Sequence, residues 1–433
     1  RRGWYAYGWA SHTFEATVVA VFAGRYITAV GDNAVGDNGR LHVLGIPIAP
    51  GSLYTYTVSL GSLLLFVVLP IVGAVADRTG HKRAMMLGFG YAGAACCTAM
   101  IFVGITDWQL GAGLFLLGYL TYSAAKIVFN SILPVLAGPD ERDRVSSIGW
   151  GIAYAGGGVL LALNFVSSFG LITDKAWLAR ISLCSAGVWW ALFMLIPLVR
   201  LRGLPRPADA RKPIGGSVLS AGFRELGNTL RSMRAFPLTL LFLAAYLIYY
   251  DGISTLTTLA AVYADAELHL GETILLATIL VVQFAGFGGA LLLGRLANIW
   301  GAKRTVIGSL VVWIGVAVAA YFLQAGNSLE FIVLALVLSI VLGGTQALSR
   351  SLFSGMIPNG KEAEFFSFYE VSSSGTSFFG PLLFGLTLQL TGSYRSAIVS
   401  LIVFFVVGLA LLIPVDAAKA IRAAGNTPPA TLR

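Results

Sequence analysis

Long apolar runs separated by short polar stretches make up most of the sequence. Twelve runs can be delimited, at residues 4–29, 51–76, 84–105, 109–135, 146–169, 177–199, 236–263, 272–297, 304–325, 329–357, 363–390 and 394–414. Because about 20 helical residues cross a hydrocarbon core of about 30 Å, each run is long enough to form a transmembrane helix. The pattern predicts an all-α membrane protein with twelve transmembrane helices and no large soluble domain.

A polar signature between the second and third runs recurs between the eighth and ninth. The two copies read Gly73-Ala-Val-Ala-Asp77-Arg78-Thr-Gly80-His-Lys82-Arg83 and Gly294-Arg-Leu-Ala-Asn298-Ile-Trp-Gly301-Ala-Lys303-Arg304. Their equivalent places indicate a duplicated membrane protein. Internal repeats of this kind are typical of transporters, in which two similar bodies rock about a shared site.

Composition and charge favour the same class. The chain is 57% hydrophobic and 11% charged, so its apolar surface cannot be hidden in a water-soluble core. With both termini inside, most loop Lys and Arg residues fall on the cytoplasmic side. The net charge of +9 is thereby explained by orientation, without a nucleic-acid partner. Cys96, Cys97 and Cys184 lie inside predicted spans, and no structural disulfide is expected.

The runs divide the chain into two halves. We expect a six-helix bundle over residues 1–199, a basic cytoplasmic linker over 200–235, a second bundle over 236–415 and a cytoplasmic tail over 416–433. Residues 217–234 of the linker could form a basic amphipathic helix on the inner leaflet, or the linker could simply be solvated. On the outer side, Gly31-Asp32-Asn33 and Gly36-Asp37-Asn38 predict turns in a surface loop over 30–50 rather than a calcium site. No cleavable signal is visible before the first span.

Each kind of residue in the signature has a physical task at a gate. Gly73 and Gly80 permit close helix approach and a tight reversal, and Gly294 and Gly301 repeat them. Cations at the turn, Arg78, Lys82, Arg83 and Arg304, hold it at the anionic inner leaflet. Asp77 can meet a helix N-terminus or an arginine and latch the inner ends of the halves. Asn298 keeps the hydrogen bond but loses the charge, so its latch should be weaker.

The signature resembles that of the Major Facilitator Superfamily. A narrower resemblance, to the vacuole-effluxer branch of that superfamily, rests on Trp4–Ala10, Phe129–Pro134, Tyr250–Gly252, Gly344–Ser351 and Glu362–Phe366. The resemblance implies twelve helices in two pseudo-symmetric six-helix bundles, with spans 1, 4, 7 and 10 lining a central cavity. It also implies export of amino acids.

Among the ionisable side chains inside predicted spans the four strongest candidates lie one on each of the helices named by the resemblance: Glu15, Lys126, Asp251 and Arg350. Charges at this depth cost free energy unless they serve a function or are paired. Lys126 and Arg350 each stand eight residues before a proline, Pro134 and Pro358, and so occupy matching heights. Two such cations suit an anionic or zwitterionic solute, with the carboxylates neutralising them. The alternative is a set of fixed ion bridges that only orient helices.

Further residues complete the predicted site. Asn130, Gln346, Tyr250 and Trp9 are expected to line it with the four charges, unless they serve packing or interfacial anchoring. Proton coupling is assigned to Glu15 and Asp251, with His12 as a relay and Glu370 as a second candidate. For His12 the alternative is a packing role. No cofactor, metal site or catalytic constellation is expected, and the chain is not expected to be an enzyme.

The sequence therefore predicts a secondary active transporter of a small polar solute, anionic or zwitterionic, with an amino acid or short peptide favoured. The alternative is a transport-inactive sensor or scaffold that keeps the fold. The expected partners are the solute, membrane lipid and protons, with no nucleic acid, and the expected state is a monomer. The expected location is a bacterial cytoplasmic membrane, with both termini in the cytoplasm.

Overall fold

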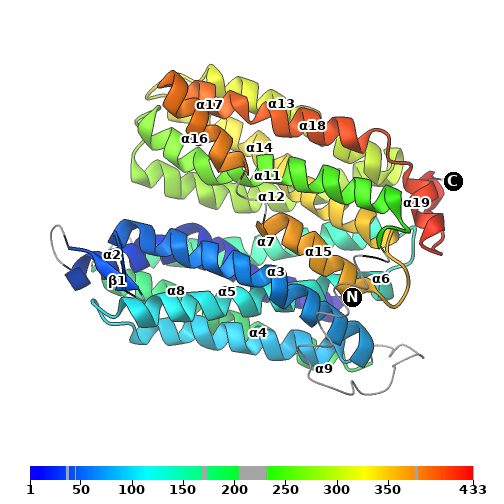
Figure 1. The fold of residues 1–433 in the computed structure, drawn as a ribbon, viewed down its shortest axis with the longest axis horizontal. Coiled ribbons are helices and arrows are strands. Elements are labelled where there is room, and N and C mark those ends of the chain that lie inside the picture. Colours follow the sequence, from blue (N-terminus) through cyan, green and yellow to red (C-terminus); the bar gives the residue numbers. More distant parts are fainter. Residues whose placement is uncertain are drawn as a thin grey trace. The chain divides into compact units, whose positions relative to one another are not determined.

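A computed structural model describes residues 1–35, 39–43, 45–167, 172, 174–203, 231, 233–375 and 379–432. Helices make up nearly all of it (Figure 1). In the first half of the chain they are α1 (Arg2–Thr13), η1 (Phe14–Phe22), α2 (Ala23–Val35), η2 (Pro50–Ser52), α3 (Leu53–Thr79), α4 (Lys82–Ala99), η3 (Met100–Phe102), α5 (Trp108–Ser131), α6 (Leu133–Leu136), α7 (Arg142–Ser167), α8 (Lys175–Phe193) and α9 (Leu195–Arg200). Strands β1 (Leu41–Val43) and β2 (Ile46–Ile48) pair antiparallel.

The second half repeats the pattern of long helices. Its helices are α11 (Pro237–Ala266), α12 (Glu272–Trp300), α13 (Ala302–Tyr321), α14 (Ser328–Gly355), α15 (Glu362–Gly375), α16 (Phe379–Thr391), α17 (Tyr394–Ser400), α18 (Ile402–Leu412), α19 (Ala417–Ala423) and η4 (Ala430–Leu432). Polar side chains begin several of them. Asp174 caps α8, and Asn327 caps α14, each by accepting hydrogen bonds from backbone N–H groups of the first turn.

Eleven helical segments among the described residues are long and apolar enough to cross a membrane. They coincide with eleven of the twelve expected spans, with ends within a few residues. Within the expected eleventh span, 363–390, the described residues form α15 and the short apolar helix α16, and residues 376–378 between them lie outside the described part. The chain is an all-α, multi-pass membrane protein, as the sequence predicts.

The turns expected in the 30–50 loop and the helix expected in the linker have different outcomes. The turn expected at Gly31-Asp32-Asn33 is wrong, because α2 continues through it to Val35. Glycine and asparagine disfavour helix only weakly, and a long apolar helix preceding them overrides that preference. The second expected turn, at 36–38, and the amphipathic helix at 217–234 fall wholly or largely outside the described residues.

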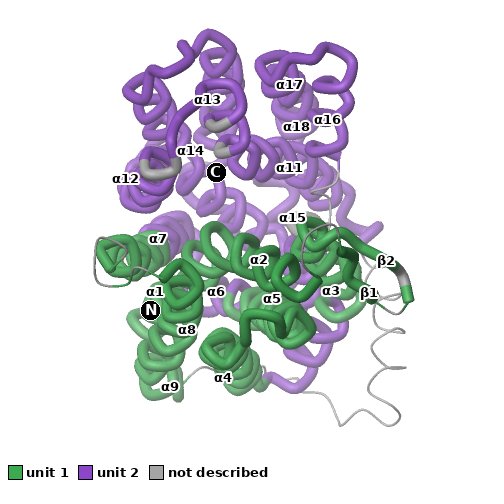
Figure 2. Tube along the Cα trace, turned by 90° about the vertical axis from the view of Figure 1, so that its left-hand side faces the viewer, with its two compact units in different colours: residues 1–69, 81–129, 152–205 green, residues 70–80, 130–151, 206–433 purple. Residues whose placement is uncertain are grey.

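The helices form two compact units whose limits do not follow the two halves of the sequence (Figure 2). The first unit contains residues 1–69, 81–129 and 152–205. The second contains residues 70–80, 130–151 and 206–433. Pro70, inside α3, stands at one of these limits, where its missing N–H interrupts the helix ladder. The second unit therefore includes two segments of the first sequence half, and the expected bundle boundaries remain predictions.

Each signature copy reverses the chain on its second glycine. Gly80 has φ of 63° and Gly301 has φ of 85°, a region that residues with a side chain rarely adopt. Basic side chains then bind carbonyl oxygens near helix ends, where the helix dipole favours a cation. Arg83 donates to Leu198 O in the first unit, and Lys303 donates to Ile413 O at 2.7 Å in the second. Both copies thus share the reversal at the second glycine and a basic contact with a helix end, which Arg83 makes in the first copy and Lys303, the equivalent of Lys82, makes in the second.

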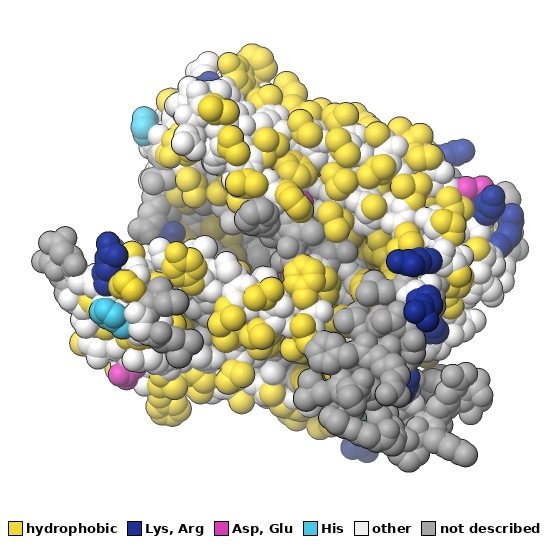
Figure 3. Space-filling model, viewed as in Figure 1, with side chains coloured by type: hydrophobic (Ala, Val, Ile, Leu, Met, Phe, Trp, Pro, Cys, Tyr) yellow, Lys and Arg dark blue, Asp and Glu magenta, His cyan; other side chains and the backbone are white. Residues whose placement is uncertain are grey.

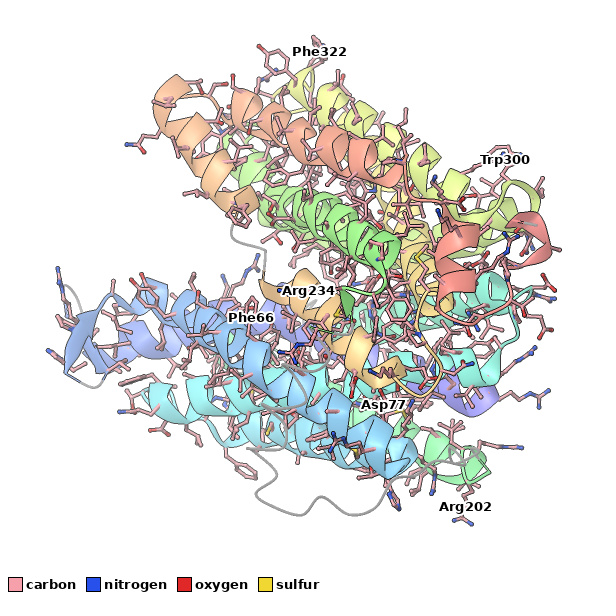
Figure 4. All side chains as sticks on the ribbon, turned by 45° about the vertical axis from the view of Figure 1, so that its right-hand side comes forward. Phe66, Asp77, Arg202, Arg234, Trp300 and Phe322 are labelled. Carbon is pink, nitrogen blue, oxygen red and sulfur yellow. The ribbon has the colours of Figure 1, made fainter. Side chains whose placement is uncertain are left out.

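The surface suits lipid along the helices and water at their ends. On the face drawn in Figure 3, apolar side chains cover the helices and charged ones gather towards helix ends. Trp300 and Phe322, which flank α13, are 55% and 70% exposed and point outward in Figure 4. Aromatic residues in such positions are typical of membrane–water interfaces.

Glycines bring α12 and α14 together in the second unit. A Cβ on Gly343 would lie 2.5 Å from Gly286 O, and one on Gly289 would meet the backbone of Ile340. The neighbouring Gly288 is exposed and has nothing within 4 Å of the same position. Close packing of membrane helices through small residues explains the difference.

Gly289→Ala should lower the free energy of unfolding by about 1–3 kcal/mol, because the methyl group meets backbone that cannot move aside. Gly288→Ala is the matched control, and its greater helix propensity should leave stability unchanged or raised by up to about 1 kcal/mol. Thermal unfolding of the two detergent-solubilised variants measures the contrast. Equal melting temperatures would contradict the packing described here.

Candidate solute site and inner gate

Glu15 lies in a π-helical stretch within the first span. Residues Phe14–Phe22 form η1, between α1 and α2, and the N–H of Ala23 donates to Val18 O, five residues back. Single π-helical turns inside α-helices are rare and are found mainly at functional sites. The apolar pattern of the sequence predicted an uninterrupted span, and nothing in it signalled this wider winding.

Lys126 pairs with Glu15 inside the first unit. Lys126 Nζ lies 3.0 Å from Glu15 Oε1, and His12 Nδ1 lies 3.3 Å from Glu15 Oε2. Lys126 Nζ also stands 5.9 Å from the centre of the Tyr122 ring. The side chains of Glu15 and Lys126 are 31% and 19% exposed, so the pair is sheltered but reachable. We call His12, Glu15, Tyr122 and Lys126 the Glu15 cluster.

His12 is held from the side of α7. Its ring meets the Tyr154 ring edge-on, with centroids 4.8 Å apart. Its Cδ2 atom lies 2.7 Å from where a Cβ on Gly157 would stand, so that glycine leaves the space that the imidazole fills. The histidine predicted from the sequence as either a relay or a packing residue is thus packed and in contact with the carboxylate.

Arg350 is buried in the second unit among polar partners. Its Nε donates to Ser146 Oγ at 3.0 Å, its Nη2 to Ser146 O at 2.9 Å and its Nη1 to Asn130 Oδ1 at 3.2 Å. The guanidinium carbon lies 5.3 Å from the centre of the Trp150 ring. Arg350 is 3% exposed. A buried guanidinium is costly unless its N–H groups donate hydrogen bonds, as those of Arg350 do here.

Asn130 connects Arg350 to Glu370. While its Oδ1 accepts from Arg350, its Nδ2 donates to Glu370 Oε1 at 2.9 Å. Asn130 and Glu370 are 1% and 4% exposed. An amide can bridge a cation and an anion in this way because it carries both an acceptor and donors. We call Asn130, Ser146, Trp150, Arg350 and Glu370 the Arg350 network.

Further contacts in the second unit join segments of the two sequence halves. Asp77 Oδ2 accepts from the N–H of Glu364 at 2.9 Å, in the first turn of α15, where the helix dipole favours a negative charge (Figure 4). Gly73 permits that approach, because a Cβ there would lie 2.5 Å from Ala363 O. Ser351 donates to Asp143 Oδ1. Glu362 and Glu364 stand in the first turn of α15.

The second signature copy is arranged differently. Asn298 and Arg304 are exposed, whereas Asp77 is buried. A Cβ on Gly294 would lie 2.5 Å from Ser147 Cβ, so this glycine packs against α7.

The first signature copy is divided between the two units. Gly73, Asp77, Arg78 and Gly80 belong to the second unit, and Lys82 and Arg83 to the first.

Asp251, on α11, bonds to the backbone of α16. Its Oδ2 accepts from the N–H of Gly380 at 2.9 Å, and the residue is 1% exposed. Thr255, one turn further along α11, lies so close to Gly380 that a side chain there would collide with it. The sequence predicted Asp251 as a counter-charge and proton carrier, and in the structure its carboxylate accepts a backbone hydrogen bond from α16.

The remaining predicted residues lie on the same helices. Trp9 stacks on Trp189, with centroids 5.8 Å apart, and Tyr250 packs on Tyr246, with centroids 5.2 Å apart. Gln346 is partly buried on α14. Sequence reasoning did not identify Ser146, Trp150, Tyr122 or Tyr154. A serine or an aromatic residue in an apolar span is too common to be a signal without the arginine or histidine that it contacts.

The fold and the buried charges define a transporter of the Major Facilitator Superfamily type. Two solved structures match along nearly the whole chain. The human organic anion transporter MFSD10 (TETRAN) matches with a TM-score of 0.63 at 15% identity, over 95% of this chain and 98% of that one. The proton:xylose symporter XylE matches with a TM-score of 0.66 at 14% identity, over 94% and 92%. At these identities the likeness shows the fold.

Sequence relatives place the chain more narrowly. The family model described as "Vacuole effluxer Atg22 like" matches residues 1–425, and the chain belongs to this family. An uncharacterized MFS-type transporter, YxiO of Bacillus subtilis, is 29% identical over 419 residues, which cover 94% of this chain and 93% of YxiO. Autophagy-related protein 22 of Saccharomyces cerevisiae (strain S288c) is 26% identical over 480 residues, covering 96% and 90%. The family and its structural neighbours are transporters and not enzymes.

Lys126→Met should lower the free energy of unfolding by about 1–3 kcal/mol, because it leaves a sheltered carboxylate without its cation. Adding Glu15→Gln to that variant should restore part of the loss, because no unpaired charge then remains. Thermal unfolding of the wild type, both single variants and the double variant gives a double-mutant cycle. Single effects that add within about 0.5 kcal/mol would show that the two residues are not coupled.

Proposed function

We propose that the protein is a secondary active transporter of a small polar solute that is anionic or zwitterionic, with an amino acid or short peptide favoured. The observation that carries this proposal is the Glu15 cluster, in which opposite charges lie 3.0 Å apart and remain partly exposed. A zwitterion can exchange with such a pair, its carboxylate taking the lysine and its ammonium group the glutamate. Both protein charges then remain paired when the solute binds.

Exposure separates the two predicted cation sites. Lys126 keeps 19% of its side chain exposed, whereas Arg350 is 3% exposed and engaged by Asn130 and Ser146. Lys126 is therefore the more accessible of the two cations in this state, and a solute can reach Arg350 only after the Arg350 network opens. We therefore assign solute binding in the present state to the Glu15 cluster, and Trp9, on the same helix α1 as His12, remains a further candidate.

The Arg350 network has the composition expected of an inner gate. It joins Asn130 and Ser146 of the first sequence half to Arg350 and Glu370 of the second, within one compact unit. The contact of Asp77 with α15 adds a second latch in the same unit. Lys and Arg residues are concentrated near these helix ends, which favours the cytoplasmic side for the gate and for both termini. The membrane proposed is the cytoplasmic membrane of a bacterium.

The descriptions of the similar proteins name several kinds of cargo. One structural neighbour is described as an organic anion transporter and another as a proton:xylose symporter, while the family is described as vacuole effluxers. The first description agrees with a cation at the site, and the second with coupling to protons. Lys126 and Glu15 decide between a sugar and a charged solute, because an uncharged sugar would leave both charges to each other.

Proton coupling is proposed for Glu15 with His12. The imidazole contacts one carboxylate oxygen and the lysine contacts the other, so protonation of Glu15 releases Lys126 for the solute. Asp251 is less suited to this exchange, since it accepts from a backbone N–H and is almost wholly buried. Glu370 is proposed to act within the gate.

Glu15→Gln should abolish solute accumulation driven by a pH gradient in proteoliposomes, while exchange of labelled for unlabelled solute persists, because only the proton site is removed. Asp251→Asn is the matched control, since the amide oxygen can still accept from Gly380, and it should retain gradient-driven uptake. A panel of amino acids, dipeptides, organic acids and sugars supplies the solute. Full uptake by the Glu15 variant would refute the coupling proposal, and ligand-induced stabilisation without flux would indicate a sensor.

Opening of the gate is tested by the exposure of Ser147, which is buried beside Ser146. The reporter is Ser147→Cys in a background without native cysteines, labelled with a polar maleimide. Asn130→Leu should raise the labelling rate about tenfold, which corresponds to destabilising the closed state by about 1.4 kcal/mol. Asn164→Leu makes the same chemical change in the first unit and should leave the rate unchanged. Equal labelling in both variants would remove Asn130 from the gate.

A further inference from the structure

The segment that follows α18 folds back across the second unit. We define residues 415–431 as the strap; it contains α19 and the first residues of η4. Asp416 begins α19 by accepting from the N–H of Lys419 at 2.9 Å. Ala417, Ala420 and Ile421 are buried, and α19 packs against α11. Buried apolar side chains in so short a helix show that it is held by tertiary packing, since an isolated helix of this length is unstable.

The strap closes the end of α14, the helix that carries Arg350. Asn426 Nδ2 donates to Gly355 O at 2.9 Å and to Ile357 O at 2.7 Å. The last carbonyl groups of a helix have no partner within the helix, and the amide supplies one. Ile421 lies 3.4 Å from where a Cβ on Gly355 would stand. The strap thereby fixes the position at which α14 ends.

The strap also reaches the first sequence half. The N–H of Ala430 donates to Asp140 Oδ1 at 2.6 Å, in the turn between α6 and α7. Thr427 and Pro429 line a small pocket together with Arg142, Asp143 and Ser351. Asp143 and Ser351 are themselves hydrogen-bonded to each other. The strap therefore spans the contact between the start of α7 and the end of α14.

We propose that the strap is a lock on the inner gate, which must be released before α14 can move away from α7. This inference rests on the gate proposed above. Ser146 and Arg350, which join α7 to α14 inside the unit, lie on the same two helices that the strap joins at their ends. Any separation of these ends breaks the bonds of Asn426 or that of Asp140. The hydrogen bonds of the strap thus add a peripheral connection between the two helices to the buried connection made by Arg350 and Ser146.

The lock is tested by the labelling assay of Ser147→Cys in the full-length chain. Asn426→Ala and Asp140→Ala should each raise the labelling rate several-fold, and together by about tenfold or more, because each removes hydrogen bonds present only in the closed arrangement. Asp140 is exposed, so its variant should fold normally. Ala423→Ser, at an exposed position of α19, is the control and should leave the rate unchanged.

The outcomes separate the two proposals. A faster rate in the Asn426 and Asp140 variants supports the lock. If Asn130→Leu raises the rate while neither strap variant does, the gate stands and the lock is refuted. If none of the three raises it, the gate and the lock both fall. Melting temperatures within a few degrees of the wild type confirm that the labelled variants are folded.

Discussion

An arginine cannot be left unpaired inside a membrane protein, and the arrangement of the second unit follows from that constraint. Arg350 donates hydrogen bonds to Ser146 and Asn130 and lies over the ring of Trp150, and all three residues belong to the first half of the sequence. The cation therefore stabilises a compact unit that contains parts of both halves. When these contacts separate, the charge needs water or another partner, which limits the states that the chain can occupy.

The two halves use related charges for different purposes. Lys126 and Arg350 stand at equivalent sequence heights, yet one meets a carboxylate directly and the other reaches Glu370 through an amide. A direct pair of modest exposure can exchange partners readily, while a buried chain of hydrogen bonds must break as a whole. Duplication supplied matching positions, and subsequent divergence separated a binding role from a closing role in the function that we propose.

The sequence was sufficient for the spans and for the superfamily, because both depend on long apolar runs and on a repeated motif. It also placed Glu15 and Lys126 on helices that do meet. It did not show that Asp251 accepts a hydrogen bond from the backbone N–H of Gly380. Backbone donors carry no residue type, so a contact with them cannot be read from side-chain identities. Ser146 escaped notice for the complementary reason, since only its position beside Arg350 distinguishes it.

The π-helical winding of η1 has a mechanical consequence. The nine residues of η1 are wound with hydrogen bonds to the fifth residue back. Each residue of an α-helix turns by about 100°, and each residue of the wider π-helix turns by less. If that stretch rewound as α-helix, His12 and its neighbours in α1 would rotate as a block about the helix axis relative to α2, without any break in the chain. The first span can thus act as a swivel, and Glu15 stands at the point where the swivel begins.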